Sequence, residues 1–532
     1  MSNEILVIQL DRIGDLIQTM PFVESLHQAF PEASVDLMVT RGNAVAVQGN
    51  PWLRRVISIS EVELSQFNSG LATKSPDGGM SELLLSWSNQ FDHCPYDQVY
   101  NCCSQRFGAW LMQQMPSASR RGGFFTPQGE WLYSGDWGPY LLSMLDYRAW
   151  NRFNLVDLFR AAGPRSVFPH PGSRSYLAKD SSWVSGLGPG VHVGLNPGAS
   201  EAHRRYPVHR FVELVQRCRE AGWIPVLVGA PSDRELCAEI VLQSEGEIAD
   251  YSGKTSIPQM AQLLSELDVL VSNDTGAVHM AAAVGTPVVG LFGVSAFLHE
   301  TGPWGEGHVI LQAPLGESPA LLETISAQAV MAAVEYQLGQ AQESHLKEAV
   351  RDCPGVEAWR STFLGPEDGP LGGVVYQPLV TGLTDFQRVW ALHLRRVFSL
   401  HLGTEVSRHL PVYRELGEWH TEWDSVFETL RPLVQSASSL AQQAKRLSTM
   451  AESDPDSSVL QGLISPFQSR FQEFLQSVEQ QSPLWPVMAF LQWKSKMVSI
   501  SQGWSGVLNH QYRTLELGRN LLLEAGCGRI GI

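Results

Sequence analysis

The sequence predicts an α/β protein in which two doubly wound parallel sheets are followed by a helical unit. Two observations predict the sheets: the order strand, turn, helix, strand appears in residues 4–40 and again in residues 190–235. This alternation is typical of βαβ units with parallel strands. A third observation, the change to long amphipathic patterns after residue 340, predicts the helices. We therefore expect three domains, with the bounds 1–175, 176–340 and 341–532.

The first lobe is expected to begin with the apolar strand EILVIQL, residues 4–10. The turn DRIGD follows, then an amphipathic helix over residues 16–30 and a second strand over residues 33–40. The second lobe repeats this order with a strand in residues 190–200 and a helix in residues 208–222. Two such runs predict two lobes that face one another, with ligands at the carboxyl ends of their strands.

The segment NDTGAVHMAAAVGTPVVGLFG follows the apolar run LDVLVS of the second lobe. A strand that ends at Asn273 and turns into a helix near Gly276 presents backbone N–H groups that favour an anion. Gly276 allows close approach of a ligand, and the Asp274 carboxylate suits ribose or sugar hydroxyls. His279 could reach a phosphate or a hydroxyl. The alternative is that Asp274 only caps the helix and His279 is a core residue.

The last third of the chain predicts a folded helical unit. Residues 383–402 place apolar side chains three and four positions apart, and further helical runs are expected at 415–451, 457–481 and 484–525. The first helix has Thr384 or Asp385 as its cap and Gly403 at its end. The apolar positions are Phe386, Trp390, Leu394, Val397 and Phe398. Seven of the 16 tryptophans lie in this third, and we expect them to form its core rather than a carbohydrate platform.

Composition excludes some classes of protein. The net charge of -16 argues against a nucleic-acid binder, which normally presents a basic face. Residues 176–340 hold 8 Lys and Arg against 18 Asp and Glu, so any anion there must be held by local geometry. Seven cysteines without metal-ligand spacing predict a reduced, cytoplasmic protein. No apolar run reaches membrane-spanning length, so we expect a soluble protein or one that is peripheral on the inner face of the inner membrane.

Several motifs carry a resemblance to a known family. They occur in this order: RIGDLIQTMPFVESLHQAFPEASVDLMV, NPWLRRVI, YDQVYNC, GLNPGAS with RRYP, VLVGAPSDRE with DYSGKTSIPQMAQLLSELD, and NDTGAVHMAAAVGTPVVGLFG. Together they resemble glycosyltransferase family 9, the ADP-heptose:lipopolysaccharide heptosyltransferases and their relatives. The resemblance covers residues 1 to about 340 and leaves the helical extension unmatched.

The resemblance implies two facing Rossmann-like domains (GT-B) and an inverting, metal-independent reaction without a cofactor. The first domain would bind the acceptor and the second the nucleotide sugar. Asp15 in RIGD falls at the position of the family's proposed catalytic base, and Gly14 beside it would let the acceptor approach. A carboxylate within reach of the acceptor hydroxyl is what an inverting transfer needs. The alternatives are that Asp15 only caps the helix, or that Asp11 is the base.

The resemblance also implies a set of donor-binding residues. Arg204 matches a position where the family carries a lysine on the phosphates, and Arg205 could substitute for it. Asp233 matches an acidic residue on the ribose, and Thr255 lies where the adenine ring is expected; ordinary capping and turn roles are the alternatives. The full set for the nucleotide sugar is Ser200, Arg204, Asp233, Thr255, Asp274, Thr275, Gly276 and His279.

Arg120 and Arg121 in ASRRGGF are candidates for contact with an anionic acceptor, such as a phosphorylated lipopolysaccharide core. The alternative is a solvated surface pair. The expected partners are therefore an ADP-heptose-like donor and a glycan or lipid-linked glycan acceptor, and no nucleic acid.

Three functions compete. The first is transfer of a heptose or similar sugar to a lipopolysaccharide core, another surface glycan or a protein. The second is a nucleotide-sugar epimerase of the same architecture, and the third is a non-catalytic nucleotide-sugar-binding scaffold whose helices bind partners. Asp15, Asp274 and a cation at position 204 favour the first. For the helical extension, homo-oligomerisation, membrane docking and presentation of a protein acceptor all stay open.

Overall fold

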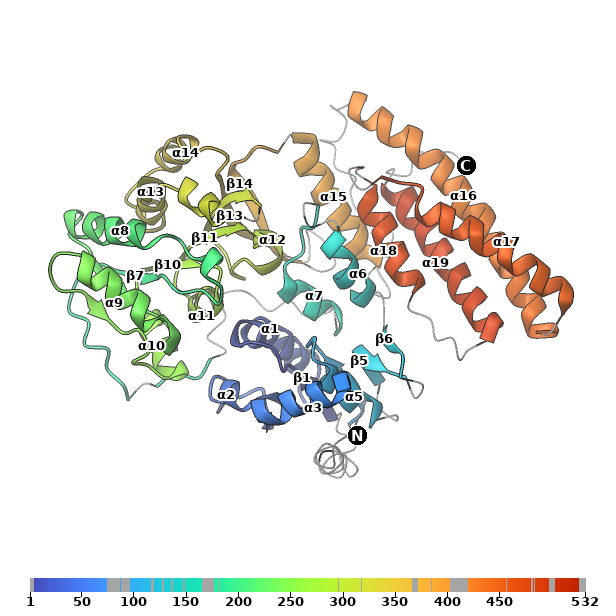
Figure 1. Cartoon of the computed structure of the whole chain (residues 1–532), viewed down its shortest axis with the longest axis horizontal. Coiled ribbons are helices and arrows are strands. Elements are labelled where there is room, and N and C mark those ends of the chain that lie inside the picture. Colours follow the sequence, from blue (N-terminus) through green and yellow to red (C-terminus); the bar gives the residue numbers. More distant parts are fainter. Residues whose placement is uncertain are drawn as a thin grey trace.

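The structure is a computed structural model of the chain. It describes residues 4–73, 87, 96–115, 119–126, 129–134, 137–146, 148, 150–164, 177–180, 182–294, 296–316, 318–365, 372–383, 385–401, 420–455, 457–479, 482, 484–496 and 503–525. Figure 1 shows two α/β lobes and a helical unit, with α6, α7 and α15 lying between the lobes and the long helices.

The first lobe is built on a six-stranded sheet with the order β3-β2-β1-β4-β5-β6. Its strands are β1 (Glu4–Ile8), β2 (Ser34–Thr40), β3 (Arg55–Ile59), β4 (Gln98–Asn101), β5 (Ser119–Phe125) and β6 (Trp131–Ser134). All neighbours are parallel except β5 and β6. The strand β1 is central, and its residues from Ile5 to Ile8 are apolar and buried, as expected of a parallel strand covered on both faces.

Helices cover the first sheet and continue toward the second lobe. They are α1 (Ile13–Ala29), α2 (Arg41–Ala44), α3 (Glu61–Thr73), α5 (Arg106–Gln113), α6 (Trp137–Ser143), the 3₁₀ turn η1 (Met144–Asp146) and α7 (Leu155–Ala161). The predicted strand, turn, helix and strand of residues 4–40 are confirmed by β1, α1 and β2.

The second lobe is built on an eight-stranded sheet with the order β14-β13-β12-β11-β10-β7-β8-β9. Its strands are β7 (His192–Asn196), β8 (Ile224–Leu227), β9 (Ala249–Asp250), β10 (Val269–Asn273), β11 (Val288–Val294), β12 (Val309–Leu315), β13 (Glu357–Leu364) and β14 (Gly373–Val380). The strand β13 pairs antiparallel with β12, and β14 pairs antiparallel with β13. The boundary predicted at residue 340 is therefore too early, because two strands beyond it complete this sheet.

The helices of the second lobe follow its strands in the expected alternation. They are η2 (Ala202–Arg204), α8 (Val208–Glu220), η3 (Pro231–Asp233), α9 (Arg234–Gln243), α10 (Ile257–Ser265), α11 (Gly276–Val284), α12 (Leu298–Thr301), η4 (Pro319–Thr324), α13 (Ala327–Gln337) and α14 (Glu343–Arg351). The N-terminus of α11 lies directly after β10, as the NDTG segment predicts.

The helical unit contains α15 (Asp385–His401), α16 (His420–Ser453), α17 (Ser458–Leu475), α18 (Trp485–Ser495) and α19 (Gly503–Ala525). The long α16 packs against α17 and α19 (Figure 1). The single run expected at 484–525 is two helices, and the proposed caps Thr384 and Gly403 lie outside the described residues. Trp359, Trp390 and Trp485 are buried, as expected of core residues. In the described parts of the chain, no helix combines the length and the apolar character that crossing a membrane needs.

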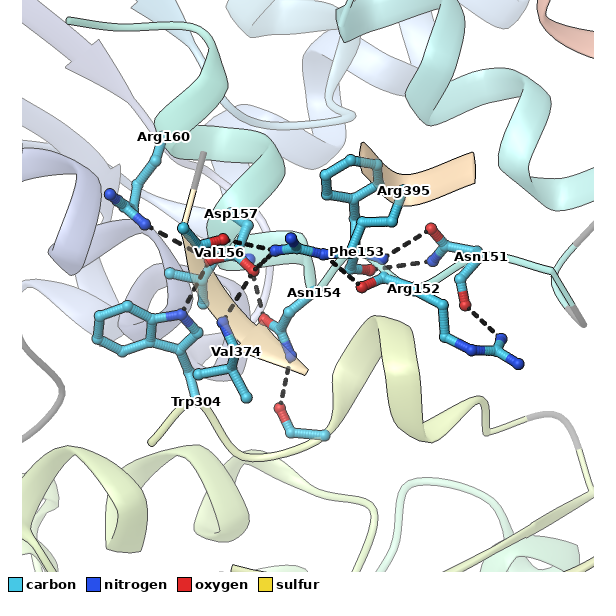
Figure 2. Close-up of polar contacts among 12 residues, drawn as sticks. Asn151, Arg152, Phe153, Asn154, Val156, Asp157, Arg160, Trp304, Val374 and Arg395 are labelled. Atoms are coloured by element: carbon cyan, nitrogen blue, oxygen red, sulfur yellow. Dashed lines mark hydrogen bonds and ion pairs between the residues drawn. The ribbon is translucent and has the colours of Figure 1, made fainter. Parts of the chain in front are cut away.

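A buried ion-pair cluster joins all three parts of the molecule (Figure 2). The carboxylate of Asp157, on α7, has no exposed surface and accepts hydrogen bonds from the Trp304 indole at 3.1 Å and the Val374 amide at 3.2 Å. Arg160 and Arg395 each place a guanidinium nitrogen 3.5 Å from it. Burial raises the pKa of Asp157, and the two arginines oppose that effect. One side chain thus links the first lobe, the second sheet and α15.

Backbone groups complete the cluster. The Arg395 guanidinium also donates to the carbonyl of Arg152 at 3.0 Å and to that of Gly372. Asn154 caps α7 and donates to the carbonyl of Gly302 at 3.0 Å. Gly373 has φ of 97°, and a Cβ atom there would lie 2.1 Å from Oδ1 of Asp157. Only glycine therefore leaves room for the carboxylate at the start of β14.

Replacement of Asp157 by alanine should strongly destabilise the protein, because two buried arginines would lose the carboxylate that they share, and the Trp304 indole and the Val374 amide would lose their acceptor. Breaking a buried pair from one side costs about 3–5 kcal/mol. We expect a lower Tm for Asp157→Ala in thermal unfolding, and a smaller loss for the double variant Asp157→Ala/Arg395→Met than the sum of the single losses. Asp352→Ala, at an exposed aspartate, is the control. Equal Tm values for Asp157→Ala and this control would contradict the role of the cluster.

Candidate active site

The first turns of α1 and α11 meet where the two lobes touch. A Cβ atom on Gly14 would lie 3.2 Å from Cδ2 of His279 and 3.6 Å from Cα of Gly276. A Cβ atom on Gly276 would lie 3.0 Å from the Ile13 side chain. Both helices point their N-termini at this contact, and helix N-termini carry partial positive charge and unpaired N–H groups. The contact brings the RIGD turn of one lobe beside the NDTG turn of the other.

Asp15 lies in the first turn of α1. Its Oδ2 accepts a hydrogen bond from the Arg12 amide at 3.1 Å, so it does contribute to the capping of α1, although Arg12 holds the N-cap position. Burial, and then the charge of Asp11, raise the pKa of Asp15 to about 6. A carboxylate with that pKa is mostly ionised at neutral pH and is basic enough to accept a proton.

Asp11 is held by its neighbours on the other side of the turn. Its carboxylate accepts hydrogen bonds from the amide and the hydroxyl of Ser104, both at 2.9 Å, and from the Gln105 side chain at 3.0 Å. These bonds fix the loop after β4 against the turn after β1. Asp11 is therefore engaged in structural contacts, which agrees with Asp15 being the better candidate for the base.

A cavity of about 770 Å³ opens beside Asp15 at the carboxyl edge of the first sheet. Its size is within the usual range for a small-molecule site. The polar walls include Asp11, Asp15 and Glu61, and the aromatic walls come from β6, α6 and α7. The remaining lining residues are Leu10, Arg12, Thr40, Asn43, Leu64, Asn101, Cys102, Cys103, Ser104, Gln105, Tyr133, Trp137, Leu141, Leu155 and Phe159.

The NDTG turn is fixed by side-chain hydrogen bonds from three sides. Asn273 donates to the carbonyls of Pro197 and Gly198 at 2.9 and 3.1 Å and accepts from the Tyr206 amide at 3.0 Å. The Thr275 hydroxyl accepts from the Ala277 amide at 3.3 Å and so caps α11. These bonds join the end of β10 to the loop after β7, which carries Arg204.

Asp274 and Arg204 form an ion pair between these two loops. The Asp274 side chain is 11% exposed, and its burial raises its pKa while Arg204 opposes the shift. The Nε of Arg204 is buried and has no hydrogen-bond partner among the described residues. Arg205 instead donates twice to the Ala199 carbonyl, at 3.0 and 3.1 Å. Of the two arginines, Arg204 is therefore the one that lies at the start of α11.

His279 lies on α11 against Gly14 of the first lobe. Burial lowers the pKa of its imidazole to about 4, so the ring is neutral at pH 7. Its Nδ1 is buried and unpaired among the described residues. Most buried polar atoms in proteins have a partner. The Nε of Arg204 and the Nδ1 of His279 are two exceptions to this rule near the junction of the lobes.

Three other predicted donor residues lie on neighbouring loops of the second sheet. Asp233 is 9% exposed, and its Oδ2 accepts from the Ala230 amide at 2.8 Å. A Cβ atom on Gly198 would lie 2.4 Å from the Asp233 carboxylate, so these loops are in contact. Ser200 is exposed after β7, and Thr255 is half-buried between β9 and α10. All three lie on loops that follow the carboxyl ends of strands.

Arg120 and Arg121 lie near the amino end of β5, where they pair with Val99 and Tyr100 of β4. The guanidinium of Arg120 stacks 5.0 Å from the centre of the Phe124 ring. Neither arginine belongs to the described lining of the cavity beside Asp15. The structure thus does not bring this pair together with the predicted base.

Two charged residues of the site were missed by the sequence analysis. Arg148, from the segment before α7, forms an ion pair with Glu300 of α12 at 3.2 Å across the lobes. Burial and the nearby Asp274 raise the pKa of Glu300 to about 7, while Arg148 opposes this. The Arg148 guanidinium also stacks 4.8 Å from the centre of the Phe297 ring. No local sequence motif predicts this ion pair, because Arg148 and Glu300 are far apart in the chain.

Comparisons with known proteins agree with this architecture. Residues 177–330 match the family model for glycosyltransferase family 9 (heptosyltransferase). Lipopolysaccharide heptosyltransferase 3 of Escherichia coli is 23% identical over 344 residues, which cover 60% of this chain and 94% of that protein. Lipopolysaccharide heptosyltransferase 2 of the same organism is 24% identical over 322 residues, 55% of this chain and 83% of that protein.

A solved structure shows the same fold. The glycosyltransferase family 9 protein from Veillonella parvula superposes with a TM-score of 0.51 at 19% identity, covering 64% of this chain and 98% of that one. The fold and these relatives define the protein as a glycosyltransferase. More particularly, its residues 177–330 match glycosyltransferase family 9, and the chain is similar to heptosyltransferases of that kind; a helical extension lies beyond the residues that the family model matches.

The two adjacent arginines offer a direct test of the anion site. Arg204→Gln should weaken the binding of the probe ADP at least tenfold, because a charged hydrogen bond contributes about 1.5–3 kcal/mol. Arg205→Gln should change it less than threefold, since that side chain is occupied by the Ala199 carbonyl. Isothermal titration calorimetry measures both. Equal losses in the two variants, or no loss in either, would contradict the assignment of Arg204.

Proposed function

We propose that the protein transfers a heptose, or a similar sugar, from an ADP-sugar to a glycan acceptor with inversion and without a metal ion. The acceptor would be a lipopolysaccharide core or another surface glycan. The observation that carries the proposal is the contact at Gly14 and Gly276, which sets the Asp15 turn beside the pair of Asp274 and Arg204. A base and an anion site on opposite lobes are what an inverting displacement requires.

In this proposal Asp15 accepts the proton of the acceptor hydroxyl while that oxygen attacks the anomeric carbon of the donor. The bond from the anomeric carbon to the diphosphate oxygen breaks as the new glycosidic bond forms, and the nucleoside diphosphate leaves. The raised pKa of Asp15, about 6, supports the role, because the group can hold the proton after it has taken it.

The second lobe would stabilise the departing diphosphate. Arg204 supplies a fixed positive charge, and the first N–H groups of α11 from Gly276 onward supply aligned dipoles. Arg204 holds Asp274 at the same turn. There the Asp274 carboxylate would accept hydrogen bonds from hydroxyl groups of the sugar or ribose. Asp233 and Ser200 would contact the ribose and phosphates, and Thr255 the base, from the neighbouring loops.

Replacement of the base should strongly slow turnover without weakening donor binding. Asp15→Asn keeps the size of the side chain but cannot accept the proton, so we expect transfer to fall about 10²–10⁴-fold. In the wild-type enzyme kcat/KM should rise with pH through about 6 and level off above it, since only the ionised carboxylate acts as a base. Product formation from pH 5 to 8 provides the measurement.

Two controls belong to this experiment. Asp15→Asn should bind ADP as the wild type does, and its Tm at pH 7.5 should not be lower, because burial disfavours the charge it removes. Turnover within threefold of the wild type would exclude Asp15 from the mechanism.

A thermal-shift screen tests the donor itself. The proteins would be the wild type and Asp274→Ala, and the ligands ADP, UDP, GDP, CDP and their sugars. We expect ADP compounds to raise the Tm of the wild type most, and the sugar moiety to add less in Asp274→Ala because its hydroxyls lose an acceptor. A larger shift with another base would overturn the ADP assignment, and no shift with any ligand would overturn the transfer reaction.

A further inference from the structure

A second cavity adjoins the cavity beside Asp15. Its volume is about 490 Å³. In the described part of the chain it is lined by Ser104, Arg106, Phe125, Gly129 and Trp131. Ser104 also lines the cavity beside Asp15, so the two cavities meet at this residue. The space beside the candidate base therefore continues toward the hairpin of β5 and β6.

Ser104, where the cavities meet, is held in place by Asp11. The amide and the hydroxyl of Ser104 both donate to the Asp11 carboxylate at 2.9 Å, and the Gln105 side chain donates to it at 3.0 Å. Ser104 is exposed. Because this residue is short, fixed and exposed, a ligand in the first cavity can extend past it into the second.

Aromatic rings on one face of the hairpin connect the two cavities. Phe125 of β5 pairs with Trp131 of β6, and Gly123 pairs with Tyr133. Residues two apart on a strand share a face, so Trp131 and Tyr133 lie side by side, with ring centroids 6.1 Å apart. Tyr133 lines the first cavity and Trp131 the second. A ligand that spans both cavities would therefore follow this row of rings.

The Trp131 ring is fixed but not covered. Its plane is perpendicular to that of Phe125, with centroids 5.1 Å apart. It also forms a hydrogen bond with Tyr133, which opposes the rise that burial causes in the pKa of Tyr133. Trp131 is half-buried, so part of the indole stays open. A rigid aromatic surface of this kind suits the C–H groups of a sugar ring, whose partial positive charge is attracted to the π electrons.

Arg106, the first residue of α5, supplies polar contacts in the second cavity. It is the one charged residue among the described residues that line this cavity. It is exposed, and its guanidinium forms no ion pair within the described ranges. Glu130 of the same hairpin accepts a hydrogen bond from the Thr126 hydroxyl at 3.3 Å and is not among the lining residues. A guanidinium only donates, so it would bind oxygen atoms of a ligand.

We propose that the second cavity is a subsite for an oligosaccharide acceptor. The sugar unit that receives the transferred sugar lies beside Asp15, and the next unit packs on Trp131 and accepts hydrogen bonds from Arg106. The acceptor is accordingly a glycan of two or more units, and Trp131 and Arg106 determine this preference for length. The inference rests on the proposed function for the role of the first cavity as the acceptor site.

The test measures glycan binding by the full chain in the presence of ADP, independently of transfer. The probes are fragments of the lipopolysaccharide core with one to four sugar units, and neutral glucose oligosaccharides of the same lengths, immobilised on an array. A concentration series of the labelled protein gives the affinity for each. We expect the tightest binding to a glycan of two or more units, with an affinity about tenfold or more above that of the corresponding single sugar.

Matched variants separate the subsite from the rest of the site. Trp131→Ala should weaken the longer glycan about tenfold or more, whereas Trp131→Phe, which keeps a ring, should weaken it about threefold. Arg106→Gln should weaken it about three- to tenfold. The control Arg121→Gln, at an exposed arginine outside the lining of both cavities, should change nothing. Binding of the single sugar should be the same in all four variants, which general damage to the fold would not allow.

Several results would overturn the inference: single sugars that bind as tightly as longer glycans, no binding by any glycan, an unchanged affinity in both Trp131→Ala and Arg106→Gln, or equal losses in Arg106→Gln and Arg121→Gln. If Trp131→Ala unfolds, Trp131→Phe and Arg106→Gln decide. Binding of ADP and transfer by the wild type separate the two proposals. ADP binding and transfer without a preference for length would refute the subsite alone, whereas absence of both would refute the proposed function.

Discussion

The contact between the first turns of α1 and α11 is the constraint on which the site depends. Gly14 and Gly276 approach so closely that a side chain at either position would press on the other lobe. Two helix N-termini converge there, and their partial positive charges repel one another unless an anion or a carboxylate lies nearby. Asp15 and Asp274 supply carboxylates next to these two turns. The same arrangement that joins the lobes therefore also places charged side chains from both lobes at one site.

The Asp157 cluster is a second connection between the lobes. Its carboxylate is shared by α7 of the first lobe, β14 of the second sheet and Arg395 of α15 (Figure 2). Beyond it, α18 packs on α6, and the Trp485 indole donates to the Asp146 carbonyl at 3.2 Å. The helical unit thus packs directly on elements of the first lobe that lie next to the Asp157 cluster. A movement that separated these elements would be unfavourable, because it would leave the buried Asp157 carboxylate without its arginine partners.

Sequence patterns predicted the features that depend on interactions between residues close together in the chain. The βαβ units and the helix that begins near Gly276 follow from periodicity and turn residues in one stretch of chain. The register of β5 against β4, which carries Arg120 and Arg121 away from the cavity, depends on pairing between distant strands. The same holds for the two strands beyond residue 340 and for the pair of Arg148 and Glu300, whose partners are brought together only by packing.

The two lobes place charges of opposite sign at the junction between them. The second lobe is acidic overall, with 8 Lys and Arg against 18 Asp and Glu in residues 176–340, yet a diphosphate needs positive charge. It concentrates that charge locally, through Arg204 and the α11 N-terminus, and keeps Asp274 paired. The first lobe does the reverse and gathers carboxylates around a small cavity. Burial, and then the charge of Asp11 in the cavity wall, raise the pKa of Asp15, so these surroundings make the candidate base more basic.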